Sequence, residues 1–435
     1  MWHPCRCAAL WAALSRSRRS GPLPTVVLLG TLDTKGEEYA FVGELLSERG
    51  MDVLLIDAGI LDAPKIAPDI SRDAVAAAAG HDIAALAAAG DRGAAVTAMA
   101  AGAAEIVGNL YDEGRLDAIL GLGGSGGSSL IAAAMRALPI GVPKLLVSTV
   151  AAGDTRPYVD TADIMLLPSV VDISGINPIS ERILRNAAAA IAGMADEFVM
   201  FEPEPPDQPL VAATMFGVTT PCVTRLREVL DELGYETLVF HATGTGGRAM
   251  ERLLTDGYLT GVLDVTTTEL ADELVGGVLS AGPERLEAAG GLGLPQVVSL
   301  GALDMVNFGP RETVPERFAG RQFVVHNPTV TLMRTTPEEN AELGAIIARK
   351  LNAATGPLAL FIPLRGVSAI AGEGAVFHDP AADTALIGAL REHLRPEIEV
   401  HALEMHINDP AFAEAMAERF DVLYQDWRSQ EREDA

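Results

Sequence analysis

The chain has 435 residues, which is too long for one average domain, so we expect two or three. A composition of 49% hydrophobic and 21% charged residues is that of a globular protein with a sizeable core. The net charge of −27 opposes phosphate backbones and anionic membranes, and no apolar run reaches the roughly 18 residues of a membrane span. Neither a nucleic acid nor a membrane is therefore an expected partner.

The three cysteines, Cys5, Cys7 and Cys222, cannot form a disulfide framework, so a reducing, cytoplasmic location is expected. The first 24 residues are basic, and no acidic residue precedes Asp33. Their apolar run comes before the arginine cluster, which is the reverse of the order in a secretory signal. We expect residues 1–24 to be a disordered leader or an upstream mis-start.

Apolar, β-branched runs alternate with helical patterns in the first half of the chain. Strands are expected at 25–30, 51–57, 117–121, 144–148 and 164–168. Helices are expected at 37–49, at 72–113 with breaks near Gly80 and Gly90, at 128–138 and at 180–194.

The segment FEPEPPDQP, residues 201–209, reads as a linker because four prolines and three acids cannot pack as a helix or a central strand. The alternation then restarts, and it predicts an α/β fold with mainly parallel, helix-covered sheets. We expect two Rossmann-like, doubly wound domains, 25–200 and 210–435, with a cleft between them. Strands of the second half are expected at 210–218, 236–241, 261–265, 296–300, 322–326, 358–363 and 397–401, and helices at 223–233, 248–254 and 410–427.

The stretch GTLDTKGEE, residues 30–38, leaves the first strand at its carboxyl end, where open α/β sheets bind ligands. Thr31 and Thr34 offer hydroxyl groups, and Lys35 offers a mobile positive charge. Asp33 offers a carboxylate for ribose hydroxyls or a metal ion. The alternative is that Asp33 or Thr34 merely caps the helix that follows.

The stretch GLGGSGGSS, residues 121–129, joins a strand-like run to an alanine-rich helical run. Such a junction directs backbone N–H groups and a helix N-terminus at an anion, usually a phosphate. Its spacing is neither that of a P-loop nor that of a dinucleotide fingerprint. The residues therefore predict a general phosphate-binding loop, with an ordinary βα turn as the alternative.

The stretch STVAAGDTRPY, residues 148–158, follows another strand end and contains Thr149, Gly153 and Asp154. Asp154 is a second candidate for ribose or Mg²⁺, and its alternative role is to close a turn before Pro157. Three strand ends on one rim of a sheet predict a single pocket.

The second half offers weaker candidates. HATGTGGRAME, residues 241–251, is a second candidate anion loop. A structural, hydrogen-bonded role is the alternative for each histidine at a strand end, and no residue stands out as a base that would activate water. Candidate acid/base or substrate-anchoring groups are His241, Asp304, His326 and Arg365.

In this order and spacing, the three N-terminal stretches resemble the Tm-one-like ATP-binding family, an otherwise uncharacterised family that includes the ATP-binding region of the tomato mosaic virus resistance protein. The similarity covers residues 24–425. It implies two Rossmann-like domains, ATP bound in the first of them, and self-association as a dimer or larger assembly. By motif, it implies ATP-binding roles for Gly30, Thr31, Asp33, Thr34, Lys35, Gly123, Gly124, Ser125, Gly126, Gly127, Thr149, Gly153 and Asp154.

We therefore expect a cytoplasmic, homo-oligomeric ATP-binding protein. In this hypothesis the loop up to Ser128 cradles the phosphates, Lys35 neutralises them, and Asp33 or Asp154 holds ribose or Mg²⁺. One alternative is a metabolic enzyme that acts on a small carboxylate or sugar acid in the interdomain cleft, with ATP as co-substrate or regulator. Another is an ATP-gated protein-interaction module. Whether the chain is an enzyme stays open.

Overall fold

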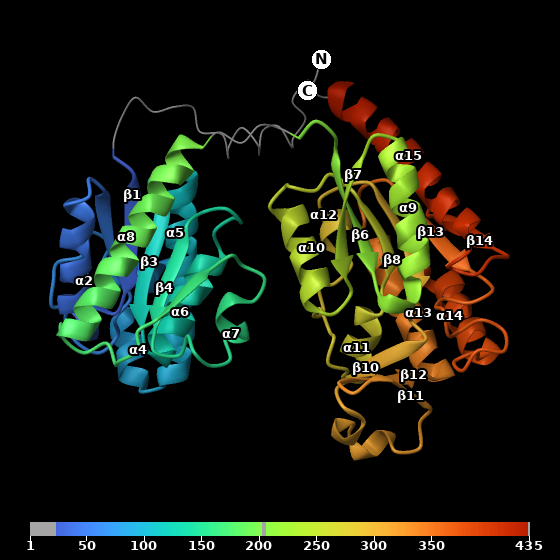
Figure 1. Ribbon diagram of the computed structural model, residues 1–435, viewed down its shortest axis with the longest axis horizontal. Helices are drawn as coiled ribbons and strands as arrows, with labels where there is room; N and C mark the ends of the chain where they lie inside the picture. The colour runs from blue at the N-terminus through green and yellow to red at the C-terminus, as the bar shows by residue number, and fades with distance from the viewer. Residues whose placement is uncertain (1–22, 202–205, 434–435) are drawn as a thin grey trace. The chain divides into compact units, whose positions relative to one another are not determined.

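The computed structural model describes residues 23–201 and 206–433 (Figure 1). These residues form two compact units, called here the N-terminal domain (23–201) and the C-terminal domain (206–433). Each unit has a parallel sheet with helices between its strands, which confirms the predicted fold of two Rossmann-like domains. Most of the predicted leader (1–22) and part of the predicted linker (202–205) lie outside the described residues, and the interdomain cleft stays a prediction.

Five parallel strands form the N-terminal sheet in the order β2-β1-β3-β4-β5. Leu28 of β1 pairs with Leu55 of β2 on one side and Leu120 of β3 on the other. This is the strand order of flavodoxin-like sheets, in which the direction of winding reverses between β1 and β3. The loops after these two strands therefore leave a crevice at the carboxyl edge of the sheet. The strands are β1 (Thr25–Gly30), β2 (Asp52–Asp57), β3 (Ala118–Gly123), β4 (Lys144–Ser148) and β5 (Met165–Pro168).

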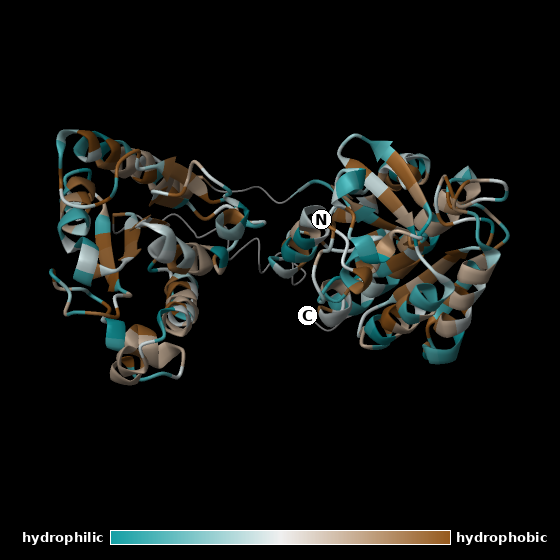
Figure 2. Cartoon of the chain, turned by 90° about the horizontal axis from the view of Figure 1, so that it is seen from below, coloured by the Kyte–Doolittle hydropathy of each residue, from teal (hydrophilic) through white to brown (hydrophobic). Residues whose placement is uncertain are grey.

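Helices cover both faces of this sheet, so the central residues of its strands are mostly apolar, and brown segments of strand are visible in Figure 2. Val27 and Leu29 of β1 face the core shared with α3, α5 and α6, whereas Val26 and Leu28 face the core shared with α2 and α8. The helices are α2 (Leu32–Ser47), α3 (Arg72–Ala78), α4 (Ile83–Ala89), α5 (Arg92–Asp112), α6 (Ser125–Arg136), α7 (Arg156–Val159) and α8 (Pro178–Met200).

Helix α2 spans Leu32–Ser47, but a kink at Lys35 separates its first turn from the helical run that was predicted to start near Glu37. Asp33 Oδ2 accepts from the N–H groups of Leu61 and Asp62, and Thr34 Oγ1 donates to the carbonyl oxygen of Thr31. Neither side chain therefore makes a capping hydrogen bond to this helix within the described residues. Leu32 to Thr34 of the GTLDTK motif form the short first turn, and Lys35 lies at the kink.

Helix α5 is the one described helix that is long and apolar enough to cross a membrane, by length and composition alone. Its alanine content accounts for this hydropathy. Met99, Ala103 and Val107 are buried in the domain core. At Gly102 the helix approaches α3 so closely that a Cβ would lie 1.8 Å from the carbonyl oxygen of Val75. These contacts are those of a core helix in an α/β domain.

Six parallel strands form the main C-terminal sheet in the order β14-β13-β9-β8-β6-β7, and its winding reverses between β6 and β8. The strands are β6 (Leu210–Met215), β7 (Glu236–His241), β8 (Val262–Thr266), β9 (Gln296–Gly301), β13 (Leu358–Pro363) and β14 (Glu399–Leu403). The helices are α9 (Thr220–Glu232), α10 (Thr245–Thr255), α11 (Glu269–Val275), α12 (Ala288–Gly291), α13 (Pro337–Asn352), α14 (Pro380–His393) and α15 (Pro410–Glu433), and 3₁₀ turns lie at Gly217–Thr219, Arg311–Thr313 and Glu316–Phe318.

A small antiparallel sheet, β10-β12-β11, adds to the C-terminal domain and was not predicted. The strand expected at 322–326 forms, but it pairs with β12 in this sheet instead of entering the parallel one. A strand's own residues do not specify its partner, so the sequence alone did not reveal this pairing. The strands are β10 (Met305–Phe308), β11 (Phe323–Asn327) and β12 (Val330–Arg334).

Candidate functional site

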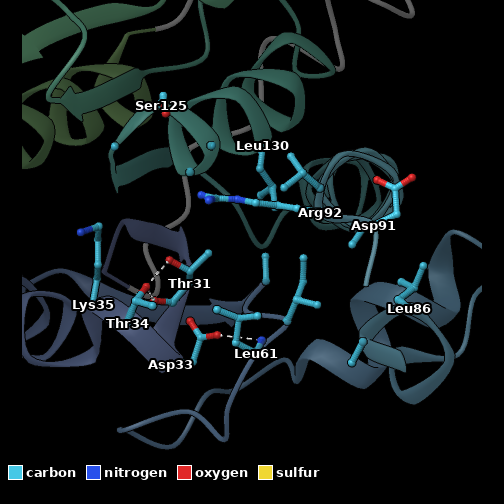
Figure 3. A pocket seen from close by; sticks show the side chains of 18 of the residues that line it. Thr31, Asp33, Thr34, Lys35, Leu61, Leu86, Asp91, Arg92, Ser125 and Leu130 are labelled. Carbon is cyan, nitrogen blue, oxygen red and sulfur yellow. Dashed lines mark hydrogen bonds between the residues drawn. The ribbon is translucent and has the colours of Figure 1, made fainter. Parts of the chain in front are cut away.

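A pocket of about 580 Å³ opens at the carboxyl edge of the N-terminal sheet (Figure 3). The first turns of α2 and α6, which follow β1 and β3, both line it. It therefore lies where the winding of the sheet reverses, the position at which open α/β sheets bind ligands. The remaining walls come from the segment after β2, from α4 and from the start of α5.

The first turn of α2 places two hydroxyl groups at the pocket. Thr31 Oγ1 and Thr34 Oγ1 lie 2.8 Å apart in a hydrogen bond. Lys35 also lines the pocket, and its φ/ψ of −122°/23° interrupts the helix. The ammonium group of Lys35 donates to the carbonyl oxygen of Ile173 at 2.6 Å, so one of its hydrogens is already bound within the domain.

Asp33 is a pocket carboxylate with one oxygen left unsatisfied. Its Oδ2 accepts from the backbone N–H of Leu61 at 3.0 Å, while Oδ1 is buried without a partner. Behind it, Asp57 accepts from the N–H groups of Leu32 (3.1 Å) and Gly59 (2.8 Å), and its Oδ2 is also buried without a partner. Burial, reinforced by the charge of Asp33, raises the pKa of Asp57. Unpaired buried carboxylate oxygens are costly, so this corner suits a cation or a hydroxyl donor.

The glycine loop after β3 is shaped for close backbone approach. A Cβ on Gly123 would lie 2.6 Å from the backbone nitrogen of Ser128, so a side chain does not fit there. Gly124 is the N-cap of α6 and no side chain caps this helix, so the N–H groups of residues 125–127 have no partner within it. Ser128 is buried and bonds to Ser148 Oγ at 2.6 Å. It therefore supports the loop from behind, while Gly124 and residues 125–127 line the pocket.

The third predicted loop does not line this pocket. Thr149 lies beside the glycine loop, since its Oγ1 is 3.7 Å from the position of a Cβ on Gly124. Gly153 closes a turn through its backbone N–H. Asp154 accepts two hydrogen bonds from the guanidinium of Arg156, at 2.9 and 2.7 Å, and one from its backbone N–H at 3.2 Å, and these lower the pKa of Asp154 to about 2. Its geometry matches the turn-closing alternative.

The wall formed by α4 and α5 includes Arg92, a residue that the sequence reasoning missed. A Cβ on Gly126 would lie 3.4 Å from Arg92 Nη2, and Figure 3 shows this side chain extending into the pocket. Arg92 is exposed and makes no hydrogen bond or ion pair with another described residue. Only two arginines occur in the alanine-rich segment 72–113, and this one lies two residues after the break at Gly90, which is the signal that the sequence offers.

The pocket also has an apolar side. It is formed by aliphatic side chains from the segment after β2, from α4, α5 and α6. The pocket thus combines backbone N–H donors and a cation with an apolar surface. This combination suits a ligand with an anionic end and an apolar or aromatic end. The larger aliphatic residues are Ile60, Leu61, Leu86, Val96 and Leu130.

The four candidate groups of the C-terminal domain are not joined by any hydrogen bond or ion pair of the described residues. His241 ends β7 and His326 lies in β11, and both are exposed. Asp304 is buried, accepts from Ser368 Oγ at 2.7 Å, and has its pKa raised to about 6 by burial. Arg365 follows β13 and lines a separate cavity.

The second glycine loop is already filled by a side chain of the protein. Glu269 Oε1 accepts from the N–H groups of Gly244 (2.7 Å) and Gly247 (3.0 Å). Its Oε2 accepts from Arg285 Nε at 2.7 Å, and Arg285 also pairs with Asp264 at 2.6 Å. The loop binds an anion, as its sequence predicts, but that anion is internal. It is therefore not an open site for a second phosphate ligand.

Fold and pocket together define a two-domain α/β protein with doubly wound sheets and a pocket at the winding reversal of the first sheet. The chain belongs to the uncharacterised protein family UPF0261, because residues 24–199 match its N-terminal domain and residues 208–424 match its C-terminal domain. A UPF0261 protein of Clostridium tetani is 52% identical over 396 residues, which cover 91% of this chain and 97% of that protein.

The ToMV resistance protein Tm-1(GCR237) of Solanum lycopersicum is 47% identical over 334 residues, which cover 76% of this chain and 44% of that protein. The resemblance to the Tm-one-like family is thereby confirmed. Among solved structures, Acinetobacter baumannii MurG aligns over 93% of this chain and 100% of its own, with 13% identity and a TM-score of 0.21, too low to carry an argument.

Proposed function

We propose that the N-terminal domain binds ATP in the pocket at the carboxyl ends of β1 and β3. One observation carries this proposal: the uncapped, glycine-rich start of α6 opens into the pocket, with the guanidinium of Arg92 opposite it. Helix N-termini and arginine side chains are preferred partners of phosphate groups. Such local donors are needed in a chain whose net charge of −27 repels anions.

In this arrangement the phosphates contact residues 124–127 and Arg92, and the base packs on the aliphatic side formed by Leu61 and Leu86. Lys35 is a secondary phosphate ligand, because its ammonium group already donates to a backbone carbonyl. The choice of ATP among nucleotides is supported by the family resemblance of the GTLDTK and GLGGSGG motifs.

A magnesium ion would be held at Asp33. Asp33 lines the pocket and its buried Oδ1 has no hydrogen-bond partner among the described residues, and Mg²⁺ typically binds one or two carboxylates together with nucleotide phosphates. Asp154 is the weaker choice because it is paired with Arg156.

Calorimetric titration of the full chain with Mg·ATP tests the proposal. Gly126→Val places a branched side chain between the glycine loop and Arg92, and we expect it to weaken binding about tenfold or more. Gly193→Val in α8 is the matched control, because a Cβ there meets nothing within 4 Å. The absence of binding at millimolar ATP, or equal affinities for the two variants, would refute the assignment.

Self-association and a cytoplasmic location belong to the same proposal. Light scattering of the purified chain, with and without Mg·ATP, gives the oligomeric state. A monomer under both conditions would contradict the oligomer while leaving the binding site unaffected.

A further inference from the structure

The C-terminal domain has a cavity of about 810 Å³ that the nucleotide proposal does not use. It is formed by the loops after β13 and β14 and by the start of α14. The carboxyl ends of parallel strands are the ligand-binding edge of such sheets. The cavity shares no lining residue with the N-terminal pocket, so it is a separate candidate site.

Buried polar groups hold the walls of this cavity in place. Arg334, which is 4% exposed, donates to Asp383 at 3.3 Å on the cavity wall. Ser368 donates to the buried carboxylate of Asp304 at 2.7 Å, and the carbonyl oxygen of Ser368 accepts from His406 Nε2 at 2.9 Å. Side chains fixed by a buried hydrogen-bond network are typical of preformed sites.

The lining residues divide into supporting and available groups. His406 is supporting, because Nε2 donates to Ser368 and Nδ1 accepts from the backbone N–H of Asn408 at 3.1 Å. The guanidinium of Arg365 makes no hydrogen bond or ion pair with another described residue, and neither does the carboxylate of Glu404. His378 uses Nδ1 on a backbone carbonyl, which leaves Nε2 available as an acceptor.

The available groups specify the chemistry of a ligand. A guanidinium binds a carboxylate through two parallel hydrogen bonds, while carboxylates and a neutral imidazole nitrogen accept from hydroxyl groups. A doubly charged phosphate is disfavoured relative to a singly charged carboxylate, since the cavity lining contains one guanidinium and four acids. A bare metal ion is also disfavoured, because the described residues contain no group of three that could hold one. The acids that line the cavity are Glu373, Asp383, Glu404 and Asp409.

We propose that this cavity binds a small hydroxylated carboxylate. Its carboxylate contacts Arg365, and its hydroxyl groups donate to Glu404, Asp383 and His378. The inference is independent of nucleotide binding, and it gives Arg365 a specific role as the anchor of the ligand.

Calorimetric titration of the full chain without nucleotide provides the test, with D-glycerate, D-gluconate and the neutral polyol sorbitol as probes. At least one of the two hydroxy acids is expected to bind about tenfold more tightly than sorbitol, because sorbitol lacks the carboxylate. Arg365→Gln should abolish this difference. Arg391→Gln, an exposed arginine of α14 that does not line the cavity, should preserve it.

Glu404→Ala supplies an independent variant, and we expect it to weaken both hydroxy acids severalfold while thermal unfolding stays unchanged. The proposal fails if neither acid binds at about 10 mM, a concentration at which even weak binding is detected. It also fails if sorbitol binds as tightly as the acids, or if Arg365→Gln binds them as tightly as the wild type. Because no nucleotide is present, failure here leaves the ATP proposal intact.

Discussion

The guanidinium of Arg92 lies opposite Gly126, so close that a Cβ on this glycine would be 3.4 Å from Nη2. Arg92 is the first residue of α5, and Gly126 lies in the first turn of α6. A cation and an uncapped helix start therefore lie on either side of the same part of the pocket. Both favour negative charge at the same point in space.

Removing this cation should weaken nucleotide binding. Arg92→Ala is expected to raise the Kd for Mg·ATP about tenfold or more and to reduce its dependence on salt, because one charge-assisted contact to phosphate is lost. The matched control is Arg115→Ala, since Arg115 is an exposed arginine whose side chain pairs, among the described residues, with Glu113 alone. Calorimetry at two salt concentrations measures both effects. An unchanged Kd in Arg92→Ala would show that the phosphates do not contact Arg92.

Helix α4 should become ordered over the bound nucleotide. None of its residues is buried, yet Leu86 and Ala87 line the pocket. Gly80 and Gly90 flank it with φ of +73° and +67°, and both have open space around them. We expect Mg·ATP to slow amide hydrogen exchange in α4 but not in α3, whose Val75 is fixed in the core. Equal slowing of exchange in both helices, or no slowing in α4, would contradict the ordering of α4 over the nucleotide.

Tyr39 fixes the spacing of β1 and β3 beneath the pocket. Its hydroxyl donates to the carbonyl oxygen of Leu29 and accepts from the N–H of Leu122 at 2.7 Å. Tyr39→Phe leaves a buried N–H unsatisfied, so the free energy of unfolding should fall by about 1–3 kcal/mol. Urea unfolding measures this loss, and Tyr158→Phe, whose hydroxyl makes no described hydrogen bond, should show little change. Equal stabilities of the two variants would contradict the bridging role.

Asp272 should make stability decrease with rising pH. Burial raises its pKa to about 7, well above that of an unfolded aspartate. The folded state then binds the proton more tightly, so this contribution is complete below about pH 4 and is lost as the pH rises through about 7. Each such group gives a slope of at most about 1.4 kcal/mol per pH unit.

Replacing Asp272 by asparagine removes this titration and keeps an oxygen for the N–H groups of Leu279 and Asn307. Urea unfolding at several pH values between 5 and 8 should show a shallower decline for Asp272→Asn than for the wild type. Asp304, whose pKa is raised to about 6, contributes to the pH dependence of stability in both proteins. The effect of Asp272 is therefore given by the difference between the two slopes. Identical slopes would exclude Asp272 as the titrating group.

The buried cluster of Glu269, Arg285 and Asp264 should be essential to the stability of the C-terminal domain. Glu269→Ala leaves Arg285 without one of its buried partners, and the expected loss of stability is about 3–5 kcal/mol. Glu269→Gln still accepts from Gly244 and Gly247, so its loss should be smaller. Thermal and urea unfolding give the ranking, with exposed Glu232→Ala as the neutral control. If Glu269→Ala is as stable as that control, the cluster contributes nothing.

The sequence predicts the alternating fold and the meeting of two motifs well, because each depends on local signals. Gly124 and Thr31 follow strands whose apolar runs are evident, and the carboxyl ends of parallel strands share an edge. For Asp154 the sequence allows either a ligand-binding role or a role in closing a turn. Its short-range pairing with Arg156 matches the turn-closing role.

What the sequence does not reveal depends on packing between distant segments. Arg92 lines the pocket from the start of α5, a helix that packs closely on α3 at Gly102, and neither motif contains a signal for the position of this helix. Glu269 reaches the second glycine loop from 22 residues beyond Gly247, and nothing in the loop's own residues indicates an internal ligand. The antiparallel pairing of β11 is of the same kind.

The position of Glu269 also bears on how many nucleotides one chain can hold. A carboxylate tethered to the same chain as its loop has a high effective concentration, and a diffusing phosphate must compete with it. Glu269 also fills the space beside the loop, since a Cβ on Gly247 would lie 2.2 Å from Glu269 Oε2. A titration should therefore saturate at one nucleotide per chain, although the sequence carries two glycine loops.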